Sequence, residues 1–394
     1  MRIILTSGCI GCIRCIACIG CLLVVAVGHA QPPFTTTTET AVKGGTQLKG
    51  LVNLDVEGKP AAKRFVIRVP APIGASARQP PALKGLVIGA HGGSGGDAVD
   101  RSGKVYATSE TALDDVIGDY ALANGFAYAS VDRDGIGGTR AGFALTMEFA
   151  EYVKGEVRLR ASRFGETASS PTRTYIVGLS AGGGIARTIA EAMPTPFDGA
   201  VIIAGAGGDV ITRMDRQQRI APLWPLIDPR AHAGLSNRDP KIAAYAEAIG
   251  TPVEARRLWP YTGASAGAAR PPAGTVENSS AKPSIPMIEV VGTWDDLVIR
   301  EVRAYRDRVE PKERHRLYQV EGVWHMSGDD DGVGGFQYAA ESRMKLDKDV
   351  ADAMGAGPSY IPTVREAFDH LVRWVEKGTA APPSQTVKPS GKLR

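Results

Sequence analysis

Cysteine is missing from most of this chain of 394 residues. All five cysteines lie in the first 21 residues and recur at every third position, from Cys9 to Cys21. No histidine or carboxylate lies among them, so they lack the mixed ligand set of a common zinc site, and we expect no metal in this protein. The residues that follow cannot form disulfides with one another and must be held together by a large apolar core.

The chain also lacks a strong excess of one charge and is poor in aromatic residues. Lysine and arginine number 46 against 42 aspartates and glutamates, and only 6% of the residues are aromatic. Nucleic-acid binding usually depends on a basic patch, often interleaved with aromatic side chains, and the sequence has no such cluster. We therefore expect no nucleic-acid partner.

A long uncharged apolar run is absent as well. The clean apolar stretch at residues 15–27 is shorter than the roughly 20 residues that a membrane-spanning helix needs. Small residues up to Ala30 suit signal peptidase, so we interpret residues 1–30 as a signal peptide. We predict a secreted or periplasmic protein with no membrane span in the mature chain. A lipoprotein anchor at Cys21 is the less favoured alternative, and the charge of Arg14 leaves open a start downstream of Met1.

Apolar runs of strand length alternate with segments of helical spacing along the rest of the chain. This alternation predicts an α/β fold, with a mostly parallel central sheet and helices on both faces. The first two runs, separated by a Gly-Lys-Pro turn, are typical of an antiparallel hairpin. We expect strands at residues 48–56, 63–69, 83–90, 126–131, 174–179, 199–204, 286–291 and 316–320, and helices at residues 112–124, 146–163, 185–193, 299–308 and 363–377.

Composition changes divide the chain into further segments. Residues 31–47 are polar and threonine-rich, which predicts a flexible leader. Residues 209–284 interrupt the alternation and are rich in Arg, Pro and Ala, as expected of a cap or lid inserted over the site. The core then comprises residues 48–208 and 285–378, and the Pro- and Lys-rich residues 379–394 are predicted to be a disordered tail.

A serine follows the predicted strand at residues 174–179, within Gly178-Leu179-Ser180-Ala181-Gly182. Glycines two residues on either side of Ser180 would let the strand and the following helix approach closely and would permit a strained turn that exposes the hydroxyl. The motif alone is weak in a chain with 47 glycines, where a plain Gly/Ser turn is the alternative. The partners below favour a nucleophile.

A serine nucleophile needs a base, and the base needs an acid that orients it. Of the six histidines, only His325 comes directly after a late strand, at the sheet edge where such sites assemble. Asp295 and Asp296 follow the preceding strand, and we favour Asp295. The order Ser180, Asp295, His325 is that of the α/β hydrolases.

Acyl transfer also needs donors for the oxyanion. The amide of Ala181 is one candidate, and the amide of Gly92 or Gly93, after the strand at residues 83–90, is the other. A phosphate-binding loop is disfavoured because no Gly-Lys-Ser/Thr follows.

Four residues near these motifs are candidates for contacting substrate. His91 precedes the glycines of the predicted oxyanion loop, and Trp294 and Trp324 flank the predicted acid and base. Either tryptophan could equally be packed in the core or at its rim. Asp132 follows a strand near the site, within Asp132-Arg133-Asp134, and structural pairing of these charges is the favoured alternative to substrate contact.

These motifs resemble those of the α/β-hydrolase superfamily, and the resemblance covers essentially residues 48–378. More narrowly, the chain resembles the tannase/feruloyl esterase branch in Pro171-x-Arg173-x-Tyr175, in residues 197–205 and in residues 374–382. The resemblance implies esters of aromatic or hydroxy acids as substrates.

We therefore predict an exported serine hydrolase that cleaves carboxylic esters through an acyl-enzyme. Its partner would be a small-molecule ester, and no metal or organic cofactor is expected. A peptidase or amidase with the same triad is one alternative, and a hydrolase fold used only for binding is the other. The sequence makes no prediction of the oligomeric state.

Overall fold

The computed structural model describes residues 34–70, 83–92, 98–99, 105–133, 138–163, 173–205, 280–293, 295, 298–323, 358–389 and 391–394. All of them belong to one compact unit, Pro33–Arg394. The predicted signal peptide and almost all of the predicted cap lie outside the described residues. Within the described part of the chain, no helix is long and apolar enough to cross a membrane.

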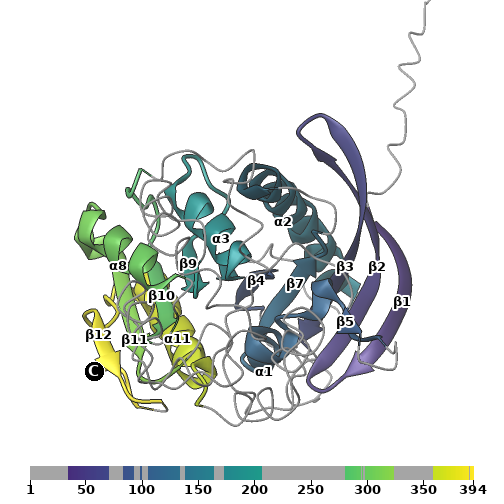
Figure 1. Cartoon of the computed structure of the whole chain (residues 1–394). Helices are drawn as coiled ribbons and strands as arrows, with labels where there is room; N and C mark the ends of the chain where they lie inside the picture. The colour runs from purple at the N-terminus through teal and green to yellow at the C-terminus, as the bar shows by residue number, and fades with distance from the viewer. Residues whose placement is uncertain are drawn as a thin grey trace, which may run out of the picture. The chain divides into compact units, whose positions relative to one another are not determined.

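One large mixed sheet organises this unit (Figure 1). Its described strands lie side by side in the order β1-β2-β3-β7-β4-β8-β9-β10-β11-β12. Their bounds are β1 Phe34–Val42, β2 Gly45–Val56, β3 Lys59–Pro70, β4 Gly85–Ala90, β7 Phe126–Val131, β8 Thr174–Leu179, β9 Gly199–Ile203, β10 Met287–Gly292, β11 His315–Val320 and β12 Gln385–Val387; a separate ribbon pairs β5 Ala98–Val99 with β6 Val105–Ala107.

The strand pairing in the sheet changes from antiparallel to parallel at β7. The strands β1, β2 and β3 run antiparallel to their neighbours, as does β7 to β3, whereas every pair from β7 to β12 is parallel. The carboxyl ends of the parallel strands therefore meet at one edge. The chain enters the parallel part at β4, continues to β7 on one side and then returns to β8 on the other. This reversal beside β4 is the point where open α/β sheets bind their ligands.

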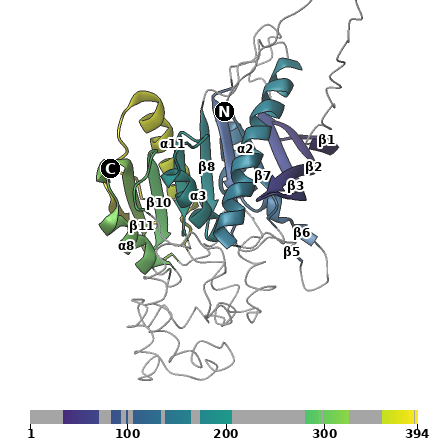
Figure 2. The ribbon, with the colours of Figure 1, turned by 90° about the horizontal axis from the view of Figure 1, so that it is seen from above.

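Helices cover both faces of the sheet. On one face lie α2 (Gly138–Arg163), α3 (Ala181–Glu191) and α8 (Ile299–Arg308). On the other lie a π-helical turn η2 (Asp114–Gly118), α1 (Asp119–Ala123) and α11 (Ile361–Lys377). Figure 1 shows α2 and α3 on one side of the strands and α1 and α11 on the other, and Figure 2 gives the same layers from above.

Burial explains why the middle strands are continuous apolar runs. Every residue of β4, β7, β9 and β10 is buried, because helices cover both faces of these strands. The predicted α/β fold, with a mostly parallel sheet and two helical layers, is confirmed.

Two of the predicted segment boundaries are wrong. Most of the predicted leader at residues 31–47 is β1 and the start of β2, which pair with each other from Phe34↔Val52 to Val42↔Gly45. The tail at residues 379–394 is not disordered where it is described, because β12 pairs with β11 and the side chains of Ala381, Val387 and Leu393 are buried. In both segments, backbone pairing or a few apolar anchors outweigh a polar composition.

Candidate active site

Ser180 occupies a sharp turn between β8 and α3. Its backbone angles are φ 53° and ψ −116°, a region that residues other than glycine rarely adopt. The amide of Ser180 donates to the carbonyl of Ile203 at 2.8 Å, and its own carbonyl accepts from the amide of Gly184 at 3.1 Å. These hydrogen bonds to β9 and to the first turn of α3 hold the serine in the strained conformation that the motif predicts.

The two motif glycines are required by the closeness of strand and helix. A Cβ on Gly178 would lie 2.3 Å from the carbonyl oxygen of Gly182. A Cβ on Gly182 would lie 2.0 Å from the carbonyl oxygen of Ala90 and 2.6 Å from that of His91. No side chain fits at either position, which confirms the predicted reason for Gly-x-Ser-x-Gly.

Gly92 lies directly beside Ser180. A Cβ added to Gly92 would be 3.2 Å from the Cβ of Ser180 and 3.3 Å from the carbonyl oxygen of Leu179. The loop after β4 and the turn after β8 therefore meet at the reversal of the sheet. The amide of Ala181 is the first of α3, where the partial positive charge of the helix end is greatest.

Asp295 lies in the turn between β10 and α8, and its side chain is fully buried. The amide of Asp295 donates to the carbonyl of Gly292 at 3.2 Å, and Oδ1 accepts from the amide of Val298 at 3.2 Å. Since β9 separates β10 from β8, the ends of these two strands are two strand spacings apart, roughly 10 Å. An imidazole between the two ends could reach both.

Apolar packing joins the serine and aspartate segments. Leu179, the residue before Ser180, packs on a buried cluster that includes Val291 of β10 and Val298 after Asp295. The other predicted site residues, His325, Gly93, Trp294 and Trp324, lie outside the described residues, as does the alternative acid Asp296.

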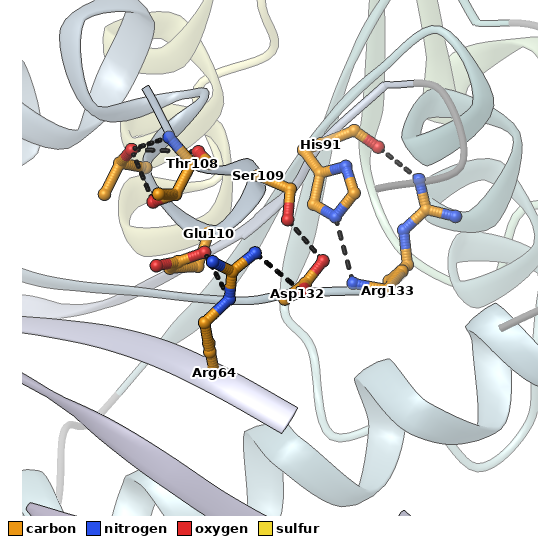
Figure 3. A network of polar contacts seen from close by, with 8 residues as sticks. Arg64, His91, Thr108, Ser109, Glu110, Asp132 and Arg133 are labelled. Atoms are coloured by element: carbon orange, nitrogen blue, oxygen red, sulfur yellow. Dashed lines mark hydrogen bonds and ion pairs between the residues drawn. The ribbon is translucent and has the colours of Figure 1, made fainter. Parts of the chain in front are cut away.

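A network of polar side chains supports the loop after β4 (Figure 3). The imidazole of His91 is buried, and its Nδ1 lies 2.8 Å from the carbonyl oxygen of Gly92. The amide of Arg133 donates to Nε2 of His91 at 3.2 Å, and the guanidinium of Arg133 donates to the His91 carbonyl. Both ring nitrogens therefore form hydrogen bonds with backbone groups of the protein. The prediction that His91 contacts substrate remains untested.

Asp132 is also buried in this network. Its carboxylate accepts from the hydroxyl of Ser109, and Arg64 of β3 donates to it at 3.2 Å. Arg64 also lies 3.5 Å from the carboxylate of Glu110. Asp132 is therefore paired with Arg64 and Ser109, in line with the structural role favoured from the sequence, and its contact with substrate stays a prediction.

Little in the sequence indicated the role of Arg133. Burial lowers the pKa of Arg133 to about 10, against the opposing effect of Asp132, so the side chain remains charged at neutral pH. The available signal was its position as a charged residue two places after the buried strand β7, at the reversal of the sheet. No such signal pointed to Arg64, Ser109 or Glu110, because their contacts depend on how β3 and the turn after β6 fold against β7.

Two further observations concern possible ligand sites. Within the described ranges, no group of three His, Cys, Asp or Glu side chains is arranged to hold a metal ion. A surface pocket of about 480 Å³ is lined by residues that include Arg306, Lys312 and His315. Since His315 begins β11, this pocket is at the amino end of that strand and not at the carboxyl edge where Ser180 lies.

Residues 118–392 match the family model described as "Alpha/beta hydrolase domain". The chain therefore belongs to the alpha/beta hydrolase domain family. No curated protein matches it.

Several solved structures are similar in fold. An esterase from Aspergillus oryzae shares 15% identity, with a TM-score of 0.45 over 89% of this chain and 88% of that one. An esterase from Pyrobaculum calidifontis shares 16% identity, with a TM-score of 0.41 over 81% and 85%. Carboxyl esterase 2 from Tuber melanosporum shares 15% identity, with a TM-score of 0.40 over 83% and 87%. The tannase/feruloyl esterase branch is not among these findings.

Proposed function

We propose that this protein is a serine hydrolase of carboxylic esters, with Ser180 as nucleophile, His325 as base and Asp295 as acid. The observation that carries the proposal is the strained backbone of Ser180, held beside the Gly92 backbone at the reversal of the sheet. Strain of this kind costs roughly 1–3 kcal/mol and persists where the surroundings impose it, commonly at active sites.

In the proposed reaction, Oγ of Ser180 attacks the ester carbonyl carbon while His325 accepts its proton. Asp295 fixes the imidazole tautomer and stabilises the imidazolium that forms. The tetrahedral intermediate collapses, the bond to the leaving oxygen breaks and His325 returns the proton to the alcohol. A water then attacks the acyl-enzyme with the same proton transfers, which frees the acid and restores Ser180.

The oxyanion would be held by the amide of Ala181 and by that of Gly92 or Gly93. Loss of one such donor typically lowers kcat roughly 100- to 1000-fold. Glycine at residue 92 suits this role because a side chain there would meet Ser180.

The substrates we propose are esters of aromatic or hydroxy acids, and we further propose that the protein is exported. The substrate proposal rests on the resemblance to the tannase/feruloyl esterase branch and on Trp294 and Trp324. The export proposal rests on residues 1–30. A panel of aryl and alkyl esters tests the first, and a preference for long aliphatic acyl chains would contradict it.

A fluorophosphonate probe tests the central proposal. The wild-type protein should be labelled once and lose activity, and Ser180→Ala should be neither labelled nor active. Ser280→Ala is the matched control, since the hydroxyl of this exposed serine hydrogen-bonds with Glu191 and with the amide of Lys282, and its removal should leave both readouts unchanged. An unlabelled but folded wild-type protein would instead support a binding role, and faster turnover of a matched amide than of its ester would support an amidase.

A further inference from the structure

The contacts of His91 define where its ring carries a proton. A carbonyl oxygen can only accept, so Nδ1 must donate to Gly92 at 2.8 Å. A backbone amide can only donate, so Nε2 must accept from Arg133 at 3.2 Å. The ring is therefore the neutral Nδ1–H tautomer, and neither nitrogen can take a proton from substrate or from Ser180 without breaking a hydrogen bond inside the protein.

The hydrogen bond from Arg133 to the His91 carbonyl also sets the direction of a peptide group. A trans peptide is planar, so its C=O and its N–H point in opposite directions. Because the guanidinium of Arg133 binds the His91 carbonyl, the amide of that same peptide unit, which is the amide of Gly92, is turned away from Arg133. The imidazole of His91 holds the other side of Gly92 through the Gly92 carbonyl. The loop thereby gains a fixed amide donor close to Ser180, where a Gly92 Cβ would come within 3.2 Å of the serine Cβ.

Arg133 holds His91 from β7. Its amide and its guanidinium both bind His91, one at the ring and one at the backbone carbonyl. The preceding residue, Asp132, is fixed by Ser109 and Arg64, and its own amide donates to the Arg64 carbonyl at 2.9 Å. The end of β7 is thus anchored on β3, and the loop after β4 is anchored on the end of β7 (Figure 3).

We propose that His91 and Arg133 are positioning residues that aim a backbone amide of the loop after β4 at the oxyanion. This inference rests on the proposed ester hydrolysis. The two residues touch no reacting atom and act only through the Gly92 peptide. Disturbing them should weaken binding of the transition state and leave binding of the ground-state ester nearly intact.

The test uses the full chain with p-nitrophenyl acetate as substrate and phenylboronic acid as a mimic of the tetrahedral intermediate. His91→Ala and Arg133→Met should lower kcat roughly 10- to 100-fold, the scale expected when a catalytic group is misplaced by about 1 Å. KM should stay within about twofold, and the inhibition constant of phenylboronic acid should rise by a factor similar to the fall in kcat/KM. Arg133→Lys keeps a cationic donor and should recover part of the activity.

Tyr120→Phe is the matched control, because it removes a hydroxyl that donates to Asp369 at 2.7 Å between α1 and α11. It should lower the melting temperature slightly and leave kcat and boronate inhibition unchanged.

Wild-type kcat and boronate inhibition in Arg133→Met would overturn the proposal, and so would a raised KM at constant kcat. If His91→Ala does not fold, the comparison of Arg133→Met with Arg133→Lys decides. Esterase activity that persists in Ser180→Ala would refute the proposed function itself, whatever the Arg133 variants do.

Discussion

The guanidinium of Arg187 and the carboxylate of Glu289 form an ion pair inside the protein, with Nε and Oε1 2.8 Å apart and side chains only 2% and 1% exposed. Nε2 of His315 lies 3.3 Å from the other carboxylate oxygen, and the ring of Tyr305 stacks on the guanidinium. Burial alone would raise the pKa of Glu289, but Arg187 and His315 outweigh burial and hold the pKa below its usual value. The pair joins α3, which follows Ser180, to β10, which precedes Asp295.

Removing one partner of this pair should be costly. Arg187→Met or Glu289→Leu leaves an uncompensated buried charge, so each should lower the free energy of unfolding by about 3–5 kcal/mol. The double variant should lose much less than the sum, because it buries no charge. Urea denaturation of the four proteins measures the coupling, and additive losses would show that the ion pair does not govern stability here.

A methyl group at Gly182 should be far more damaging than one at another helical glycine. Gly182→Ala forces a shift of the Ala90 carbonyl or of α3, so both melting temperature and esterase activity should fall. Gly155→Ala in α2 is the control, because no atom lies within 4 Å of its added Cβ. The control should stabilise the protein by up to about 1 kcal/mol, the helix propensity of Ala over Gly. Equal melting temperatures of the two variants would contradict the close approach at the turn.

The strain at Ser180 predicts that two inactive variants differ in stability. Glycine adopts φ 53° and ψ −116° without a Cβ clash, whereas alanine does not. Ser180→Gly should therefore be about 1 kcal/mol more stable to denaturant than Ser180→Ala, although neither should react with a fluorophosphonate. An Ala variant as stable as the Gly variant would mean that the turn relaxes when the serine is removed.

Stability should depend on the protonation of Asp114 in η2. Burial raises the pKa of this carboxyl to about 7, with Arg68 opposing the shift. A raised pKa means that the folded protein binds the proton more tightly than the unfolded chain. The contribution of Asp114 is therefore complete below about pH 4 and declines by about 1.4 kcal/mol per pH unit until pH rises through 7. Asp114→Asn should abolish this part of the slope in urea denaturation between pH 4 and 8. Parallel stability curves for the two proteins would contradict it.

The sequence predicted best the parts of the fold that are buried on both faces. Strands such as β8 and β10 are short and apolar, with a glycine at or next to the carboxyl end, so their pattern reflects their surroundings directly. β1 escaped prediction because its residues, largely threonine, are held mainly by pairing with β2, which leaves little trace in hydrophobicity. The helix expected at residues 112–124 is a π-helical turn followed by α1, a local change of hydrogen bonding that composition does not encode.

The candidate site likewise has features that the sequence could predict and features that it could not. Ser180, Gly92 and Asp295 could be proposed as site residues from the sequence because each follows an identifiable strand in a motif that turn geometry explains. The Arg187–Glu289 pair and the contacts between Arg133 and His91 could not, since they join residues 102 and 42 positions apart in the chain. Such contacts depend on strand order, which single-sequence patterns do not determine.

The glycine at residue 182 has a consequence for attempts to alter this protein. The first turn of α3 packs closely against the carbonyls of Ala90 and His91. The serine turn and the loop after β4 therefore form one rigid unit. Neither can be shifted to suit a new substrate without moving the other. Laboratory evolution toward new esters should therefore collect its changes in the long connections that follow the parallel strands, and spare both glycines of the turn.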